Sequence, residues 1–86
     1  MTIYHKFGFV FNSETGNNKK YKVISPLGKT IYFGDRSFSQ YHDRIGEYAS
    51  KDHYNLVRRN NYRTRHRNDY INDPEHSGYY SWHFLW

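Results

Sequence analysis

The sequence predicts a small α+β domain, with an N-terminal antiparallel sheet of about three strands, one or two short helices, and a packed aromatic segment at the C-terminal end. Three observations predict it. The chain has 86 residues, which fits one domain over residues 1–86. It contains 10 Tyr, 6 Phe and 2 Trp, whereas disordered segments are poor in aromatic residues. Alternating apolar and polar residues, separated by turn residues, fill the first 35 positions.

Turn signals divide the predicted sheet into its strands. Residues 3–11 are aromatic and β-branched, which predicts one strand with Gly8 in its interior. Residues 12–18 are rich in Asn, Ser and Gly and predict a turn. Residues 19–25 and 29–34 alternate apolar and polar side chains, and the Ser-Pro-Leu-Gly between them fits a type I turn. Together these segments predict three strands, about the minimum for a stable sheet.

Two short helices are expected after the sheet. In residues 37–45, three apolar side chains fall at spacings of three and four, and Gly46 follows as a stop signal. Ser50 is a suitable N-cap for a second helix, with Asp52 in its first turn, and this helix would run to about Arg67. Its expected inner stripe is Tyr54, Val57, Asn61, Tyr62 and Arg65, and its expected outer face carries Arg59, Arg63 and Arg67.

The excess positive charge lies in one segment. The chain has 13 Lys and Arg against 8 Asp and Glu, a net charge of +5. Residues 51–67 hold six of these bases and one acid, so the rest of the chain is neutral. An Arg-rich segment on a neutral domain predicts a localised contact with nucleic acid or an acidic protein surface, the alternative being a solvated helix face. The predicted contact residues are Lys51, Arg58, Arg59, Arg63, Arg65 and Arg67.

The last nine residues are unusually apolar. Residues 68–77 are polar and predict a loop, but residues 78–86 contain six large apolar side chains. Such a segment has to be packed, either in the core of its own domain or against a partner. The expected core or interface anchors are Tyr79, Tyr80, Trp82, Phe84, Leu85 and Trp86.

The composition excludes several classes of function. The chain has no cysteine, so it carries no disulfide, no Cys-ligated zinc, no iron–sulfur cluster and no thiol nucleophile. It has no glycine-rich phosphate loop, and no apolar run approaches the roughly 20 residues that cross a membrane. Its first residues lack the apolar stretch of a secretory signal. We expect no cofactor, no membrane span and no small-molecule substrate.

The six histidines form no recognisable metal or catalytic motif. No two of them are four residues apart, as in the H-E-x-x-H zinc helix. A metal site could be assembled in space from His42, Asp43, His53 and His66, but nothing in the local sequence supports one. His42-Asp43 followed by Arg44 has the residue types of a small nuclease site, but not a nuclease spacing, and a chain this short has little room to exclude water. The sequence predicts that the protein is not an enzyme.

The aromatic residues have two possible uses. Tyr and Trp stack on the bases of single-stranded nucleic acid, with Arg beside them. They also serve as anchors of protein interfaces, where Tyr, Trp and Arg are enriched. Composition alone leaves both open.

A series of short motifs runs in order from Lys19 to Trp86. They are Tyr21-Lys22-Val23, Ser25-Pro26, Gly28-Lys29-Thr30-Ile31-Tyr32-Phe33-Gly34, Tyr41-His42-Asp43, Lys51-Asp52-His53, Arg58-Arg59, Tyr62, Arg65-His66, Ser77-Gly78, Ser81-Trp82 and Leu85-Trp86. In this order, over about four-fifths of its length, the chain resembles an uncharacterised family of small basic proteins encoded by nucleocytoplasmic large DNA viruses, with looser relatives in large phages. Lys51-Asp52-His53 departs from that family, whose members more often place the His first, and the first 18 residues lie outside the resemblance.

The resemblance implies a viral origin and a place in the virion. The family has no established activity. The sequence therefore predicts a non-enzymatic structural component of the virion of a large double-stranded DNA virus, a minor capsid or capsid-associated protein. Before assembly it would be found in the host-cell cytoplasm or the viral factory. Its expected partners are viral structural proteins and DNA or RNA, bridged by the Arg-rich helix and the aromatic surfaces. The alternative is a small nucleic-acid-binding protein acting in the infected cell.

Overall fold

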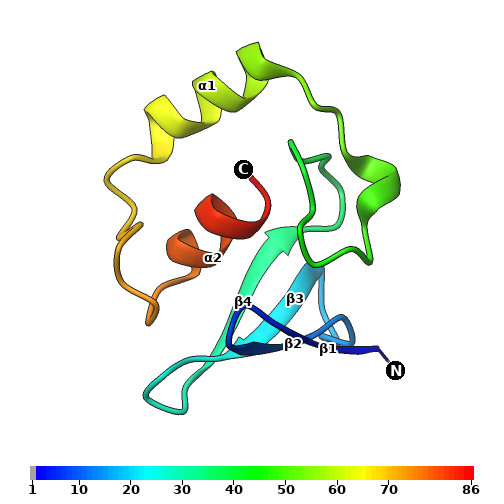
Figure 1. The fold of residues 1–86 in the computed structure, drawn as a ribbon, viewed down its shortest axis with the longest axis vertical. Helices are drawn as coiled ribbons and strands as arrows, with labels where there is room; N and C mark the ends of the chain where they lie inside the picture. Colours follow the sequence, from blue (N-terminus) through cyan, green and yellow to red (C-terminus); the bar gives the residue numbers. More distant parts are fainter. Residues whose placement is uncertain (1) are drawn as a thin grey trace.

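The computed structural model describes residues 2–86 and has the predicted α+β architecture (Figure 1). A four-stranded antiparallel sheet with strand order β1-β2-β3-β4 is followed by a long irregular segment and two α-helices. No helix within residues 2–86 is both long and apolar enough to cross a membrane. The elements are β1 (Ile3–Lys6), β2 (Phe9–Asn12), β3 (Lys19–Ile24), β4 (Thr30–Asp35), the 3-10 helix η1 (Ala49–Lys51), α1 (Leu56–His66) and α2 (Ser77–Phe84).

The predicted first strand is two strands, which raises the number of strands from three to four. β1 and β2 pair as a hairpin around a two-residue turn, Phe7-Gly8. Both turn residues have positive φ, 56° and 80°, the backbone of the type I′ turns that suit the twist of paired strands. This conformation is strained for Phe7, but its ring stacks on Phe84 with centroids 5.1 Å apart. The single-strand prediction was wrong because Gly8 is the turn residue rather than an interior strand residue.

The hairpin of β3 and β4 is confirmed. Tyr21 pairs with Phe33 and Val23 with Ile31, so these side chains share one face. The Gly28 amide donates to the Ser25 carbonyl at 2.9 Å, as a β-turn requires. Gly28 itself has φ 82°, a conformation that glycine adopts without strain.

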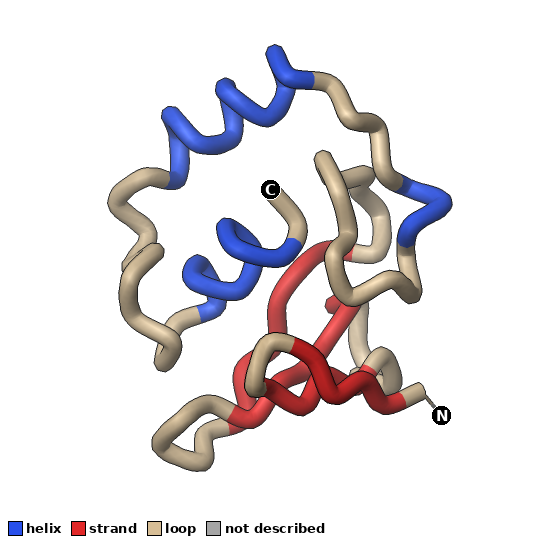
Figure 2. The backbone as a smooth tube through the Cα atoms, viewed as in Figure 1, coloured by secondary structure: helices blue, strands red, loops and turns tan. Residues whose placement is uncertain are grey.

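The core lies between this sheet and the C-terminal segment. α2 packs beside β4, and the chain end returns between α1 and the segment that follows β4 (Figures 1 and 2). The prediction of a packed aromatic C-terminal segment is therefore confirmed. The buried hydrophobic residues are Phe11, Tyr21, Val23, Ile31, Phe33, Ile45, Tyr80, Phe84 and Leu85.

Residues 37–45 are not a helix, contrary to the prediction. They form turns and a single bridge between Gln40 and Asp52. Ile45 is buried, but Phe38, which the helical spacing places on the same face, is 66% exposed. The backbone is held in turns because the Asp43 side chain binds the amides that follow it.

The second predicted helix begins later than expected. Ser50 lies in η1, and Asp52 follows it with extended backbone instead of lying in a first helical turn. The N-cap of α1 is Asn55, whose side-chain oxygen accepts hydrogen bonds from the amides of Val57 and Arg58. The end of α1 agrees with the prediction to within one residue.

The buried and exposed faces of α1 also differ from the predicted ones. Of the predicted inner stripe only Tyr62 faces inward, while Val57 is 69% exposed. Of the predicted outer face only Arg67 is fully exposed. The half-buried residues of α1 are Arg59, Tyr62, Arg63 and His66.

Candidate nucleic-acid interface

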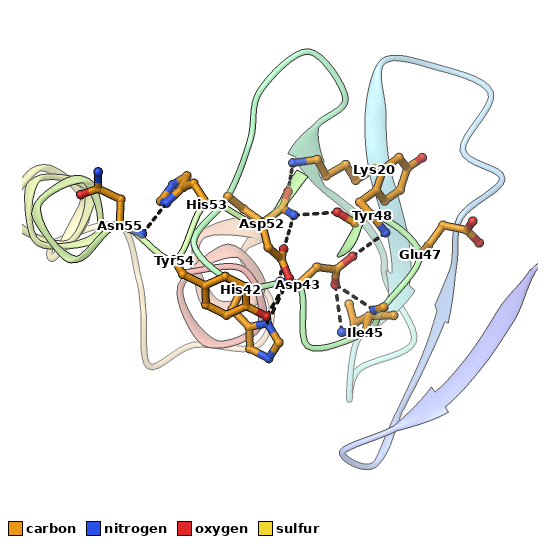
Figure 3. A network of polar contacts seen from close by, with 12 residues as sticks. Lys20, His42, Asp43, Ile45, Glu47, Tyr48, Asp52, His53, Tyr54 and Asn55 are labelled. Atoms are coloured by element: carbon orange, nitrogen blue, oxygen red, sulfur yellow. Dashed lines mark hydrogen bonds and ion pairs between the residues drawn. The ribbon is translucent and has the colours of Figure 1, made fainter. Parts of the chain in front are cut away.

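A buried carboxylate shapes the irregular segment that leads to α1 (Figure 3). The Asp43 carboxylate accepts a hydrogen bond from the Tyr21 hydroxyl at 2.5 Å and from the amides of Ile45, Gly46 and Tyr48 at 2.8 to 3.1 Å. Burial and the bond to Asp43 raise the pKa of Tyr21. One side chain thus ties the 43–48 turn to strand β3.

A second carboxylate, Asp52, continues this network (Figure 3). It accepts hydrogen bonds from the Gln40 amide at 2.5 Å, the Asp43 backbone amide at 2.7 Å, and His42 Nδ1 at 3.1 Å. Burial acts to raise the pKa of Asp52, but these three hydrogen bonds outweigh it and lower that pKa. The Gln40 side-chain oxygen accepts a bond from Lys20 on β3. The residues just before α1 are therefore fixed to the sheet.

Lys20 is an almost fully buried cation. Only 1% of the residue is exposed, and its ammonium donates to the Phe38 carbonyl at 2.8 Å and to Gln40. No carboxylate in residues 2–86 pairs with it directly. Burial, followed by the nearby charge of Lys51, lowers the pKa of Lys20 to about 8. The charged form is thus disfavoured in the folded protein.

The buried lysine predicts an unusual dependence of stability on pH. Between pH 8 and 10 the unfolded chain keeps the Lys20 proton and the folded protein loses it, so the free energy of unfolding rises by about 2 kcal/mol. Above pH 10 the unfolded chain loses the Tyr21 proton, which the folded protein keeps, so stability falls again. Urea unfolding from pH 7 to 11 measures this curve. The rise should disappear in Lys20→Met and persist in Lys29→Met, whose side chain is exposed; a wild-type curve that is flat from pH 8 to 10 contradicts the prediction.

A groove of about 500 Å³, which we call the basic groove, lies where α1, the sheet and the chain end meet. Its basic lining residues are Lys19, Lys20, Arg58, Arg65 and His66, and its aromatic ones are Phe38, Tyr62 and Trp86. A hollow of about 540 Å³ adjoins it, and Arg58, Arg65 and Trp86 line both. Asp35 is the one carboxylate among the residues lining the groove.

Two of the three aromatic residues that line the basic groove, Tyr62 and Trp86, are stacked, whereas Phe38 is exposed. The Tyr62 ring lies parallel to Trp86, with centroids 4.3 Å apart and planes 5° apart, and stacks on His66 at 4.2 Å. Two rings this close and this parallel have to lie on opposite faces of Tyr62. Both faces of Tyr62 are therefore covered, and a nucleotide base cannot stack there. The groove is better suited to a phosphate backbone than to bases.

Two of the predicted contact residues, Arg58 and Arg65, line the basic groove with exposed side chains. They lie seven residues apart, two turns along the same flank of α1. Arg58 also donates to the Ser39 hydroxyl at 3.0 Å. Burial, followed by the charge of Arg58, lowers the pKa of neighbouring His53.

The other four predicted contact residues lie elsewhere. Arg59 and Arg63 both donate to the backbone oxygen of Trp86, at 2.8 Å and at 3.1 to 3.3 Å. The Lys51 ammonium donates to the Arg36 carbonyl. Arg67 is exposed just beyond the end of α1. The charged segment found in the sequence is thus divided between groove contacts and internal contacts.

Three basic groove residues, Lys19, Lys20 and His66, were not among the contact residues predicted from the sequence. Lys19 lies far from the Arg-rich segment, and nothing in the local pattern connects the two. His66 is neutral in a charge count, although its position four residues after Tyr62 places both rings on one helix face.

The arginines have no acidic partners. Within residues 2–86 the ion pairs join only histidines to aspartates: His42 to Asp52, His66 to Asp69, and His76 to Asp73. No Arg or Lys in this part of the chain is paired with a carboxylate of the same part. The exposed guanidinium groups of Arg58 and Arg65 are therefore available to an external anion.

The structure does not assemble the candidate metal ligands. His42 is bonded to Asp52 and His66 to Asp69, and Asp43 is fully occupied by Tyr21 and backbone amides. The Nε2 atom of His53 is buried without a hydrogen-bond partner. In the described residues, 2 to 86, no three His, Asp or Glu side chains lie close enough together to hold a metal ion.

Comparisons with protein-family models, curated proteins and solved structures find no match for this chain. The chemistry of the candidate site is therefore argued from its own residues. These are two exposed guanidinium groups on one flank of a helix, with Lys19 and His66 in the same groove.

Proposed function

We propose that this protein binds nucleic acid without catalysing a reaction on it, by contacting the phosphate backbone through the basic groove. The observation that carries the proposal is the placement of Arg58 and Arg65 in one groove with Lys19 and His66, with no ion pair from either arginine to an Asp or Glu side chain of residues 2–86. A guanidinium group donates paired hydrogen bonds that match phosphate geometry. A contact made to the phosphate backbone would be independent of base sequence.

We place this binding in the virion of a large double-stranded DNA virus, as a minor capsid or capsid-associated protein that touches the packaged genome. The resemblance to the family of viral proteins supports this setting. The outer face of the sheet also supports it, because Ile3, Val10, Ile24 and Tyr32 are 38 to 50% exposed there and suit packing on a neighbouring subunit. Mass spectrometry of purified particles tests the setting: absence of the protein would favour a free nucleic-acid-binding role in the infected cell.

Replacing Arg58 and Arg65 with Gln is expected to weaken binding to a short DNA duplex. The plot of log affinity against log salt has a negative slope, and its magnitude decreases by about 0.9 for every phosphate that is no longer neutralised. The double variant should therefore reduce the magnitude of the slope by about 2. Fluorescence anisotropy between about 50 and 200 mM salt covers the range in which phosphate neutralisation changes affinity most. The change should be largest at the low-salt end.

The matched control is the variant with Lys22→Gln and Lys29→Gln. It also removes two positive charges, but from strand β3 and from the turn between β3 and β4, away from the basic groove. An equal decrease of affinity in the two variants would show that only net charge matters, and the groove would not be the site. No binding of DNA or RNA by the wild-type protein at about 50 mM salt would disprove nucleic-acid binding as such.

A further inference from the structure

A second cationic surface lies on the other flank of α1. At 3.6 residues per turn, Arg63 is about 140° around the helix from Arg58 and about 160° from Arg65. Arg63 therefore points away from the basic groove. On this other flank its guanidinium lies 4.4 Å from the centre of the Trp82 ring. Arg59 is also half-buried, and its guanidinium lies 5.0 Å from the centre of the Tyr41 ring.

Arg44 joins this flank from a distant part of the chain. Its backbone amide donates to the Phe84 carbonyl at 3.0 Å, which places it beside the chain end that Arg59 and Arg63 also bind. The pKa of Arg63 reflects this proximity, because it is lowered first by burial and then by the charges of Arg59 and Arg44. Three like charges are thus gathered at one end of α2.

These guanidinium groups retain unused donors. Arg59 uses one N–H and Arg63 two in binding the Trp86 backbone oxygen, out of five on each side chain. The Arg44 side chain is exposed and makes no hydrogen bond or ion pair with any residue from 2 to 86. Arg59 and Arg63 are held by the Trp86 oxygen and by ring contacts, and none of the three is paired with an Asp or Glu side chain of residues 2–86.

We propose that Arg44, Arg59 and Arg63 form a second phosphate-binding surface, so that one molecule joins two separate segments of nucleic acid. This inference rests on the proposed function, since it assigns the same ligand chemistry to the other flank. A helix is about 10–12 Å across, and duplex DNA has a persistence length of about 50 nm. A duplex seated in the basic groove, between α1 and the sheet, would have to bend sharply around α1 to reach the second surface. A duplex that took α1 into its major groove, about 12 Å wide, would instead touch both flanks, and two labelled duplexes distinguish these arrangements.

Bridging is measured with two short DNA duplexes of one sequence, one carrying a donor dye and the other an acceptor. Energy transfer should rise when the protein is added at about 50 mM salt. Arg44→Glu should reduce this signal at least fivefold while weakening binding to a single duplex, measured by anisotropy, by less than threefold. The exposed side chain of Arg44 makes this variant safe for folding, which its melting temperature checks. Lys29→Glu is the matched control and should bridge as the wild type does.

The other outcomes separate a failure of the second surface from a failure of the proposed function. If the wild-type protein binds a duplex but gives no energy transfer, or if Arg44→Glu bridges normally, the second surface is wrong and the proposed function survives. If bridging depends on protein dimers, as shown by sedimentation at the same concentrations, the inference is likewise overturned. If Arg44→Glu bridges normally but no longer binds polyglutamate, the surface belongs to an acidic protein. If no duplex is bound at all, the proposed function fails and this inference with it.

Discussion

Deleting residues 82–86 is expected to abolish the cooperative unfolding transition of the protein. The deletion removes Phe84 and Leu85, which are 6% and 1% exposed. Truncating a buried Phe costs about 3–5 kcal/mol and a buried Leu about 2–5 kcal/mol. It also removes the Trp86 oxygen that holds Arg59 and Arg63. A domain of this size has a total stability of roughly 4–13 kcal/mol, so the combined destabilisation of about 5–10 kcal/mol is comparable with it.

Two leucines provide a matched test of this explanation. Leu85→Ala should lower the free energy of unfolding by about 2–5 kcal/mol, whereas Leu27→Ala, at a position 83% exposed, should change it by less than about 0.5 kcal/mol. Urea unfolding followed by circular dichroism measures both variants and the deletion. A deletion variant that still unfolds cooperatively near the wild-type midpoint would show that the C-terminal segment is not part of the core.

Asp43→Asn is expected to destabilise the protein by about 3–5 kcal/mol. The carboxylate accepts hydrogen bonds from the Tyr21 hydroxyl and three backbone amides. An asparagine presents an NH₂ group to some of these donors, leaving buried groups unsatisfied at about 1–3 kcal/mol each. The exposed Asp69→Asn, which weakens only a surface interaction with His66, should cost less than about 1 kcal/mol. Thermal melts of the two variants compare them directly, and equal shifts would show that the Asp43 network does not stabilise the fold.

The features that could be predicted from the sequence are those determined by neighbouring residues. The β3–β4 hairpin follows from a period of two and a Pro-Leu-Gly turn within a few residues. Residues 37–45 show the opposite case, because their helical spacing is overridden by Asp43, which binds Tyr21 on β3, 22 residues earlier. The start of α1 was misplaced for a similar reason, since Asp52 is used in bonds to Gln40 and His42 rather than as a helix terminus.

The candidate site was predictable in charge but not in geometry. Counting residues locates the excess of arginine in 51–67, because charge is a local property of the sequence. The orientation of each arginine depends on Trp86, whose backbone oxygen binds Arg59 and Arg63 from 27 and 23 residues away. No local pattern contains that information. Arg59 and Arg63 were therefore grouped with Arg67 on an outer face that the folded chain does not have.

The distance along the chain between β4 and α2 determines how the protein reaches its native state. Each β-hairpin can form within about 1–10 μs, because its strands are adjacent in sequence. α2 has to find the sheet across about 40 intervening residues, and the entropy lost in closing such a loop slows the step before any contact compensates for it. Until then Phe11 and Phe33 face water. We therefore expect residues 77–85 to dock after both hairpins have formed.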